Sequence, residues 1–349
     1  MSFSARLVAW QRRHGRSGLP WQDTRDPYRI WLSEIMLQQT QVAAVLAYYT
    51  RFLERFPDVG SLARAPIDDV LALWSGLGYY RRAHHLHAAA RAIVDQHGGA
   101  FPRDAATLAT LPGIGRSTAA AIAAFAYGER NAILDGNVKR VLARHRGIEG
   151  WPGAPKVEAV LWKVAESLMP DDGVEVYTQG MMDLGATVCL RSRPRCDMCP
   201  VNEDCIALVT HRIEELPAPR PAKALPHREV RLLVIERDGA LLFEKRPANG
   251  IWGGLWSMPE CGMDEDVGAV ARARFAAEVG VRGTMPPIEH GFTHYTLTMH
   301  PMRCEVSVWP QAVAQPHSTW LAPNEALQAG IPAPIRKLVL RLQALEVGR

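Results

Sequence analysis

The stretch LPGIGRSTAAA, residues 111–121, joins a tight turn to an alanine-rich segment. Gly113 and Gly115 can adopt the backbone angles that a tight turn requires, and Pro112 fixes the chain direction before them. The alanines that follow favour a helix. Because the first backbone N–H groups of a helix have no partner within it, they can bind an anion. The stretch therefore predicts a turn that leads into an anion-binding helix N-terminus, with Ser117 in the first helical turn.

Helical patterns extend on both sides of this turn, up to about residue 212. Apolar residues recur at i, i+3 and i+4 in segments that short turns separate. The N-terminal part is therefore predicted to be mainly α. Its helices are expected at 30–56, 68–77, 81–97, 117–128, 137–145, 157–169 and 176–190.

The character of the sequence changes after residue 216. Four prolines between 217 and 226 predict a semi-rigid linker over 217–229. Beyond it, apolar segments flank Asp238-Gly239, which favours the positive φ angles of a tight β-hairpin. The rest, 230–349, is predicted to be a smaller α+β domain. Further strands are expected at 292–300 and 302–308, and helices at 267–280 and 334–345.

Length and composition fit two folding units, because 349 residues exceed what one hydrophobic core usually serves. The net charge of +4 selects no partner. The N-terminal residues lack the apolar core of a secretory signal, and no apolar run is long enough to span a membrane. A soluble, cytoplasmic protein without a membrane partner is expected.

One basic cluster favours a nucleic-acid partner. Clusters of basic residues are solvated helix faces about as often as they are nucleic-acid-binding sites. Here, however, Tyr79 and Tyr80 directly precede Arg81 and Arg82. Aromatic rings stack on bases and guanidinium groups bind phosphates.

Four of the six cysteines lie within the 17 residues of CLRSRPRCDMCPVNEDC. In a reducing compartment disulfides are disfavoured, so four thiolates this close predict one metal centre. Zinc sites commonly use two short-spaced cysteine pairs, and only one C-x2-C occurs here, so a 4Fe–4S cluster is favoured over zinc. Its expected role is structural. The ligands would be Cys189, Cys196, Cys199 and Cys205, whereas Cys261 and Cys304 are expected to be ordinary thiols.

Glu34 and Asp135 are carboxylates in unusual positions. On a helix, Glu34 would share an apolar face with Ile30 and Trp31, and desolvation would raise its pKa and suit it to general acid catalysis. The alternative is a first-turn glutamate that the helix dipole favours. Asp135 precedes a helical stripe, so it is either an ordinary N-cap or an anion that the helix N-terminus keeps ionised. An anion opposite a protonated carboxyl is what glycosidic-bond cleavage uses.

These stretches together resemble a known family. LPGIG at 111–115 and LDGNVKRV at 134–141 look like the hairpin and the following aspartate of the helix-hairpin-helix DNA glycosylases. The C-x6-C-x2-C-x5-C loop is similar to the iron-sulfur loop of their endonuclease III branch. More narrowly, LPWQDTRDPYRIWLSEIMLQQTQV, WSGLGYYRRAHHLH, ILDGNVKRVLARH and QGMMDLGATVC are similar to the MutY-type adenine DNA glycosylases, over nearly the whole chain.

The resemblance implies a helical catalytic domain over 1–216, with a helix-hairpin-helix at about 108–125 and an iron-sulfur loop at 189–205. A Nudix-like domain that recognises 8-oxoguanine would occupy 230–349. The implied activity is monofunctional removal of adenine mispaired with 8-oxoguanine or guanine in double-stranded DNA, after base flipping, in base excision repair. A bacterial, nucleoid-associated monomer is implied.

The resemblance also assigns roles by matched position. Glu34 would protonate adenine N7 and later assist the water, Asp135 would stabilise the oxocarbenium-like sugar, and Asn137 would position Asp135. The residues implied to contact DNA are Trp21 in the base pocket, Gln179 at the adenine edge, Gln38, Gln39 and Tyr79 as wedges with Leu37 beside them, and the hairpin backbone at Gly113 and Gly115.

In the second domain, GLWSMPE at 254–260 keeps the opening of a Nudix box, but the segment 273–278 loses most metal-binding carboxylates. Divalent-metal hydrolysis is therefore not expected, and the domain is expected only to bind. Phe292, Thr293 and His294 match the Phe-Ser-His lesion-reading loop of the family. Threonine keeps the hydroxyl of serine and adds a methyl group.

Three other functions are alternatives to this interpretation. A bifunctional glycosylase and lyase for oxidised pyrimidines needs an amine nucleophile, and that branch carries lysine where this chain has Ser117. A non-catalytic iron-sulfur DNA-binding protein would not require Glu34 and Asp135 together. A nucleotide pyrophosphohydrolase is disfavoured by the missing carboxylates.

Overall fold

The computed structural model describes residues 1–222, 224–310 and 317–347. They form two compact units, one of 1–63 with 88–222 and one of 64–87 with 223–349. The sequence placed 64–87 with the other helices; by compactness this segment groups with the C-terminal part instead. Residue 223 of the predicted linker and 311–316 and 348–349 of the predicted C-terminal domain lie outside the described residues. Among the described residues, no helix has the length and apolarity needed to cross a membrane.

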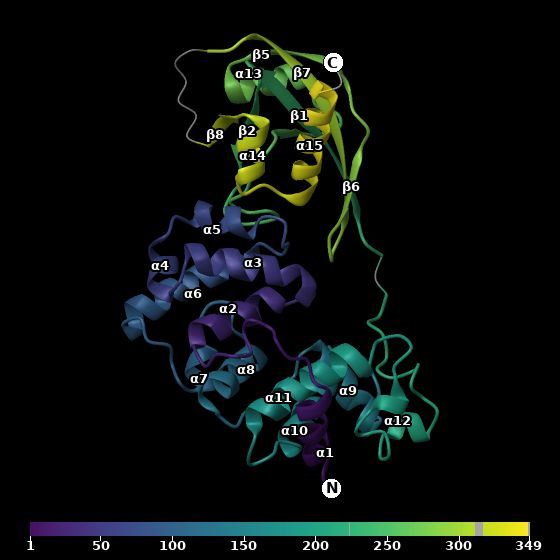
Figure 1. Cartoon of the computed structure of the whole chain (residues 1–349). Helices are drawn as coiled ribbons and strands as arrows, with labels where there is room; N and C mark the ends of the chain where they lie inside the picture. The colour runs from purple at the N-terminus through teal and green to yellow at the C-terminus, as the bar shows by residue number, and fades with distance from the viewer. Residues whose placement is uncertain (223, 311–316, 348–349) are drawn as a thin grey trace. The chain divides into compact units, whose positions relative to one another are not determined.

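The first unit is helical, as predicted. Its core lies under α1, α8, α9, α10 and α11, where residues such as Leu7, Ala124, Leu142 and Leu184 are fully buried. Figure 1 shows α1, α9, α10 and α11 grouped around this core. The helices that begin in this unit are α1 (Phe3–His14), α2 (Pro27–Leu37), α3 (Val42–Arg55), α4 (Val59–Arg64), α7 (Ala105–Leu108), α8 (Arg116–Tyr127), α9 (Gly136–Arg146), α10 (Pro155–Ser167), α11 (Val174–Asp183), the π-helix η1 (Leu184–Val188), the 3-10 helix η2 (Cys196–Met198) and α12 (Ile206–Val209); α5 (Ile67–Trp74) and the start of α6 (Arg81–His97) belong to the other unit.

Two predicted helices are each divided in the structure. The segment 30–56 contains α2 and α3, because Gln39 has φ 56°, a left-handed conformation that ends a helix. The segment 176–190 changes from α11 to the π-helix η1 after Asp183. The apolar periodicity continues through both breaks, so it could not locate them.

The predicted turn at 111–115 joins α7 to α8, and this pair of helices is the helix-hairpin-helix. Gly113 has φ +75°, which favours glycine, and the N–H of Ile114 donates to the carbonyl of Leu111 at 3.1 Å to close the turn. Gly115 takes an extended conformation at the N-cap of α8. The first N–H groups of α8 therefore face the turn.

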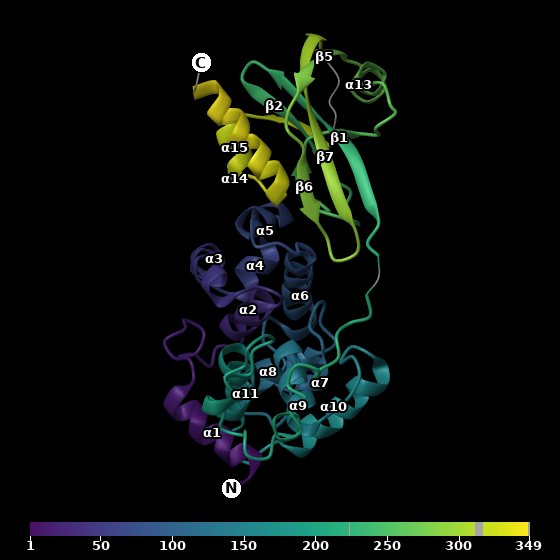
Figure 2. The same ribbon diagram turned by 90° about the vertical axis from the view of Figure 1, so that its right-hand side faces the viewer.

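The second unit is built on a mixed sheet with strand order β3-β2-β1-β7-β5, to which β4, β6 and β8 add at β1, β7 and β2. Figure 2 shows α13 on one side of this sheet and α14 and α15 on the other. Long strands β1 and β7 pair in parallel at its centre. The elements are β1 (His227–Arg237), β2 (Ala240–Lys245), β3 (Trp256–Ser257), β4 (Glu260–Cys261), α13 (Val267–Phe275), β5 (Glu278–Thr284), β6 (Ile288–Gly291), β7 (Thr296–Val308), β8 (Ser318–Leu321), α14 (Pro323–Gln328) and α15 (Ala333–Val347).

The predicted hairpin is confirmed. Asp238 and Gly239 have φ 52° and 75° between β1 and β2, where Arg237 pairs with Ala240. Three details differ from the prediction. The helix expected at 267–280 ends at Phe275, because Ala276 has φ 51°, and β5 begins at Glu278. Strand β1 begins at His227, inside the predicted linker, and the segments expected as two strands form the single strand β7, which starts only at Thr296.

Candidate active site

Glu34 lies on α2 at the wall of a cavity of about 570 Å³. Asp26 caps α2 by accepting the N–H of Tyr28 at 2.9 Å, and Pro27 occupies the first turn. Glu34 is therefore about two turns into the helix, which excludes the alternative of a first-turn glutamate stabilised by the helix dipole. Burial raises the pKa of Glu34 to about 8, and the charge of Asp135 adds to this. Glu34 is thus protonated at neutral pH, as a general acid must be.

The cavity is lined by apolar side chains, by amide side chains and by charged groups such as Arg16 and Glu175. Trp21 packs edge to face on Tyr49 with ring centroids 5.2 Å apart. Leu37 and Phe125 add apolar surface, and Gln179 reaches the cavity from α11. The predicted residues Trp21, Leu37 and Gln179 therefore line the same space as Glu34. Its volume and lining are typical of a pocket for a small planar ligand.

Asp135 is the N-cap of α9, and its Oδ1 accepts the N–H of Val138 at 2.8 Å. Burial raises the pKa of this carboxyl, while the N–H groups of Val138 and Asn137 and the charges of Arg140 and Lys139 oppose the shift. Asp135 is therefore an N-cap whose charge acts on Glu34, and the interpretation that the helix N-terminus keeps it ionised stays a prediction. The hydrogen bonds from the helix N-terminus favour the ionised form of Asp135 and so oppose the effect of burial.

Ser117 secures the segment that carries Asp135. Its Oγ accepts the backbone N–H of Leu134 at 2.9 Å. Ser117 is therefore not a routine helix residue, because it ties the start of α8 to the residue before Asp135. Lys139, on α9, donates to Glu158 at 2.8 Å.

Asn137 is pressed against the π-helix η1. A Cβ atom on Gly185 would lie 2.5 Å from Cβ of Asn137 and 3.1 Å from its Cα, so only glycine permits this approach. Arg140 joins the two segments, donating from Nη2 to Oδ1 of Asn137 at 2.8 Å and to the carbonyl of Gly185 at 2.7 Å. Its Nε donates to the carbonyl of Cys189 at 2.8 Å. The cysteine loop is thus linked to Asn137 through one guanidinium.

The predicted wedge residues lie at two strained turns. Gln38 ends α2, and its Nε2 donates weakly to Thr118 Oγ1 at 3.4 Å. Gln39 is exposed with φ 56°, and Tyr79 is 49% exposed with φ 49°. Backbone strain at non-glycine residues is typical of functional sites. Tyr79 belongs to the second unit and the two glutamines to the first.

The four clustered cysteines line one cavity of about 30 Å³ together with Arg144. Arg144 donates to Cys189 Sγ at 3.4 Å and to the carbonyl of Leu190 at 2.6 Å. Within the described part of the chain, no three His, Cys, Asp or Glu side chains converge on a position for a single metal ion. A zinc ion needs ligands at about 2.3 Å from one centre, whereas each thiolate of a 4Fe–4S cluster binds a different iron and can stand farther apart. The donor set, four thiols around one cavity, fits such a cluster.

Comparisons with known proteins agree with this geometry. Residues 32–167 match the HhH-GPD superfamily of base excision DNA repair proteins, and 230–341 match the NUDIX domain. An adenine DNA glycosylase of Buchnera aphidicola is 34% identical over 97% of this chain and 96% of its own. The chain belongs to the adenine DNA glycosylase family. The mouse adenine DNA glycosylase is 33% identical over 97% of this chain and 77% of its own. The structure of a thermostable thymine-DNA glycosylase matches 60% of this chain and 95% of its own, with 28% identity and a TM-score of 0.55.

As an adenine DNA glycosylase, the enzyme acts on DNA and breaks the N-glycosidic bond of adenine in base excision repair. The prediction of a helix-hairpin-helix glycosylase with a Nudix-like domain is confirmed. The cavity beside Glu34 is the candidate site for this reaction.

In the second unit of the glycosylase, Phe292, Thr293 and His294 form the turn between β6 and β7, which the N–H of Phe292 closes by donating to the carbonyl of Tyr295 at 2.8 Å. Thr293 and His294 are exposed. Phe292 stacks on Tyr295 with centroids 4.6 Å apart and contacts Trp252 at 5.2 Å. The aromatic packing holds the turn in place and leaves its two polar side chains accessible.

The remnant of the Nudix box is neutralised by arginines. Glu260 pairs with Arg246, and Arg274 pairs with Glu244 and donates to the carbonyl of Glu260 at 2.7 Å. Guanidinium groups at these carboxylates oppose the binding of a divalent cation. The expectation that the domain binds without metal-dependent hydrolysis stays a prediction.

Local sequence patterns do not identify Asp183, Arg16 or Gln11 as site residues. Asp183 is fully buried, and it accepts hydrogen bonds from Gln11, Arg16 and Gln179. One sequence signal could have indicated the contact between Gln179 and Asp183. The two residues are four positions apart on one helix and therefore share a face. The position of Gly185 was not identified either, since close approach to Asn137 leaves no periodic pattern.

Proposed function

We propose that this glycosylase removes adenine that is paired with 8-oxoguanine or guanine, after turning the nucleotide out of the duplex, and that it does so as a monomer on bacterial chromosomal DNA. The observation that carries the proposal is the position of Glu34 at the wall of the cavity, where burial and the charge of Asp135 raise its pKa to about 8. A cavity of about 570 Å³ can receive one base only once that base has left the stack.

In this reaction Glu34 donates its proton to N7 of the adenine. The bond between C1′ and N9 then breaks, and its electron pair stays on a base that departs uncharged. The sugar becomes an oxocarbenium-like cation, which the carboxylate of Asp135 stabilises while Asn137 holds that segment. Glu34, now a carboxylate, accepts a proton from the water that attacks C1′, and the starting state returns.

The rate of adenine release is expected to fall as pH rises through about 8, because Glu34 loses the proton that it must donate. The sign follows from the raised pKa: the active, protonated form exists below it. Single-turnover rates at a series of pH values would measure this. A Glu34→Gln variant keeps the shape without the titration, and its residual rate should not show the same fall. A wild-type rate that rises across this range would contradict the role of Glu34.

The Nudix-like domain is proposed to read the base opposite adenine through Phe292, Thr293 and His294. His294→Ala is expected to lower the preference for 8-oxoguanine over guanine by about tenfold, the value of one hydrogen bond in a polar site. The measurement is the ratio of single-turnover rates on the two duplexes. Thr293→Ser is the matched control, since it keeps the hydroxyl and should preserve the ratio. Equal loss on both duplexes would mean that the turn does not recognise the lesion.

The cysteine loop is proposed to hold a 4Fe–4S cluster through Cys189, Cys196, Cys199 and Cys205. The cluster would supply a rigid cross-link of the loop. Arg140 contacts both the Cys189 carbonyl and Asn137, so the loop supports the active site through protein contacts. Purified protein should contain iron and acid-labile sulfide in equal amounts. Stoichiometric zinc without sulfide would contradict the assignment.

A second activity, strand cleavage, is not proposed. A lyase needs an amine that forms a Schiff base with the sugar, and Ser117 offers a hydroxyl that is engaged with Leu134. Borohydride treatment during the reaction is therefore expected to trap little covalent complex. High-yield trapping would favour the bifunctional alternative.

The deciding experiment is a single-turnover assay on duplexes with adenine opposite 8-oxoguanine, guanine or thymine. Release is expected in the first two and little in the third. Absence of release from all three, with binding retained, would favour a non-catalytic DNA-binding protein and overturn the proposal.

A further inference from the structure

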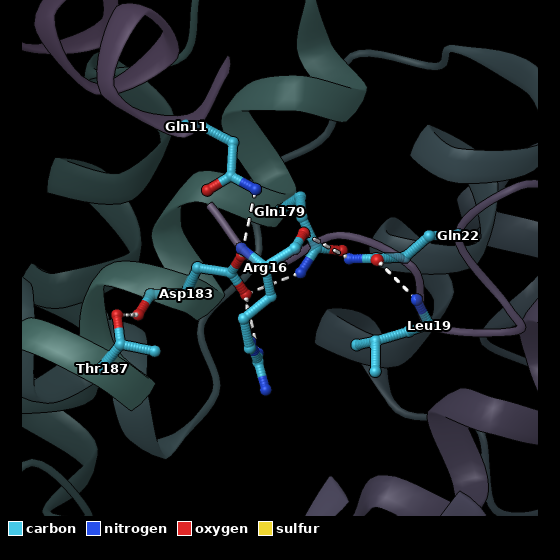
Figure 3. A network of polar contacts seen from close by, with 7 residues as sticks. All are labelled: Gln11, Arg16, Leu19, Gln22, Gln179, Asp183 and Thr187. Carbon is cyan, nitrogen blue, oxygen red and sulfur yellow. Dashed lines mark hydrogen bonds and ion pairs between the residues drawn. The ribbon is translucent and has the colours of Figure 1, made fainter. Parts of the chain in front are cut away.

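Asp183 is fully buried behind the active-site cavity, and it accepts hydrogen bonds from three residues that line the cavity, Gln11, Arg16 and Gln179. Figure 3 shows its carboxylate between Gln11, Arg16 and Gln179. Oδ1 accepts hydrogen bonds from Arg16 Nε at 2.8 Å and Gln179 Nε2 at 2.8 Å, and it forms an ion pair with Arg16 Nη2 at 2.7 Å. Oδ2 accepts Gln11 Nε2 at 3.0 Å and the backbone N–H of Arg16 at 2.8 Å. Every partner is a donor, so the group acts purely as an acceptor.

The surrounding structure fixes this carboxylate. Helix α1 approaches α11 closely at Gly180, where an added Cβ would lie 3.3 Å from Cβ of Gln11. The loop that carries Arg16 is closed by Gln22, which donates to the carbonyl of Arg16 at 3.1 Å and accepts the N–H of Leu19 at 3.2 Å (Figure 3). The Oγ1 of Thr187 donates to the backbone carbonyl of Asp183 at 2.7 Å. Asp183 is therefore held from α1, the following loop and its own helix.

This arrangement determines which way the amide of Gln179 faces. A primary amide has a donor end and an acceptor end, and only the donor end can meet a carboxylate that accepts. If the amide were reversed, its carbonyl oxygen would face Asp183 and two acceptors would meet. With Nε2 bound to Asp183, Oε1 is the end left for the cavity, and within the described part of the chain it accepts no hydrogen bond.

An acceptor held at that place selects a donor on the ligand. Adenine carries a 6-amino donor, whereas purines with oxygen at that position carry an acceptor. We propose that Asp183 is a positioning residue that locks the Gln179 amide with its carbonyl toward the cavity, so that the enzyme recognises the 6-amino group of the flipped base. This inference rests on the proposed function and adds the origin of its base selectivity.

The test removes the 6-amino group from the substrate and the lock from the enzyme. Single-turnover rates are measured on duplexes with adenine, or with purine that lacks the amino group, opposite 8-oxoguanine. For the wild-type enzyme, loss of the amino group is expected to slow release by about tenfold or more. This penalty is expected to shrink to about twofold or less in Asp183→Asn and in Gln179→Ala. The new amide of Asp183→Asn offers Gln179 either a donor or an acceptor, so it no longer fixes the orientation of Gln179. Gln11→Ala removes another donor from the same carboxylate and should keep the full penalty.

A purely structural role for Asp183 predicts a different result, because it would slow release of both bases by the same factor and leave the penalty unchanged. That outcome overturns the inference. If Asp183→Asn does not fold, the rate of hydrogen exchange of the Gln179 side-chain amide protons is measured in the wild-type enzyme instead. The Gln179→Ala variant is used to assign their signals. Protected protons are expected, and rapid exchange overturns the lock. Failure of the proposed function is separate, since wild-type enzyme would then release no adenine.

Discussion

Replacing Asp135 by asparagine is expected to lower the single-turnover rate of adenine release by about 10²- to 10³-fold, the usual cost of losing one preorganised electrostatic contact with a transition state. Asparagine caps a helix about as well as aspartate, so the hydrogen bond to Val138 and the fold should persist. What disappears is the negative charge that we propose to stabilise the oxocarbenium-like sugar.

Measurements of mismatch binding and thermal unfolding separate these effects. The Asp135→Asn protein is expected to bind the adenine mismatch as the wild-type enzyme does and to unfold at a similar temperature. The matched control is Asp266→Asn, which changes another N-cap aspartate, at α13, that accepts the N–H of Ala269 at 2.7 Å. It should leave the rate unchanged. An undiminished rate in Asp135→Asn would reduce Asp135 to an ordinary helix cap.

The variant should also move the pH dependence. The charge of Asp135 contributes to the raised pKa of Glu34, after burial. Without that charge the pKa of Glu34 falls, so the residual rate of Asp135→Asn is expected to decline at lower pH than the wild-type rate does. The two carboxyls therefore act as a pair, and the effects of Glu34→Gln and Asp135→Asn should not add.

Much of this site could be predicted from local sequence. Gly113 was identified because a tight turn needs a positive φ, and Asp135 because it precedes an apolar stripe with helical spacing. Both features depend on residues next to one another in the chain. The same holds for Asp238-Gly239 and for the cysteine spacing. The residue roles at Glu34, Gln179 and His294 came instead from resemblance, because spacing alone described them only as parts of helical or strand faces.

Other features depend on contacts between distant segments and left no local signal. The break at Gln39 lies inside continuous apolar periodicity, which predicted one helix where there are two. The engagement of Ser117 with Leu134 joins residues 17 positions apart. Asp183 has no local sequence signal, because a single aspartate on an apolar helix does not predict its partners. These partners, Gln11 and Arg16, lie near the N-terminus of the chain.

Gly185→Ala is expected to impair both stability and catalysis. The methyl group would lie 2.5 Å from Cβ of Asn137 and 3.1 and 3.2 Å from its backbone Cα and C atoms, distances that require the two segments to separate. Forcing atoms into a packed interior typically costs about 1–3 kcal/mol of unfolding free energy. Since Arg140 bridges Asn137 and the Gly185 carbonyl, the separation also disturbs the residue beside Asp135. A misplacement of about 1 Å in such a site can lower the rate by about 10²-fold.

The control for this variant is Ala186→Gly, in the same π-helix. It should destabilise the segment by about 1 kcal/mol through backbone flexibility, without pushing on Asn137. Unfolding in urea and single-turnover rates are compared for the two proteins at a temperature where both are folded. If catalysis depends on the position of Asn137, Gly185→Ala loses far more activity than Ala186→Gly at similar stability. Equal activities would show that the π-helix contributes to the fold alone, and that the contact through Arg140 does not transmit its position to the active site.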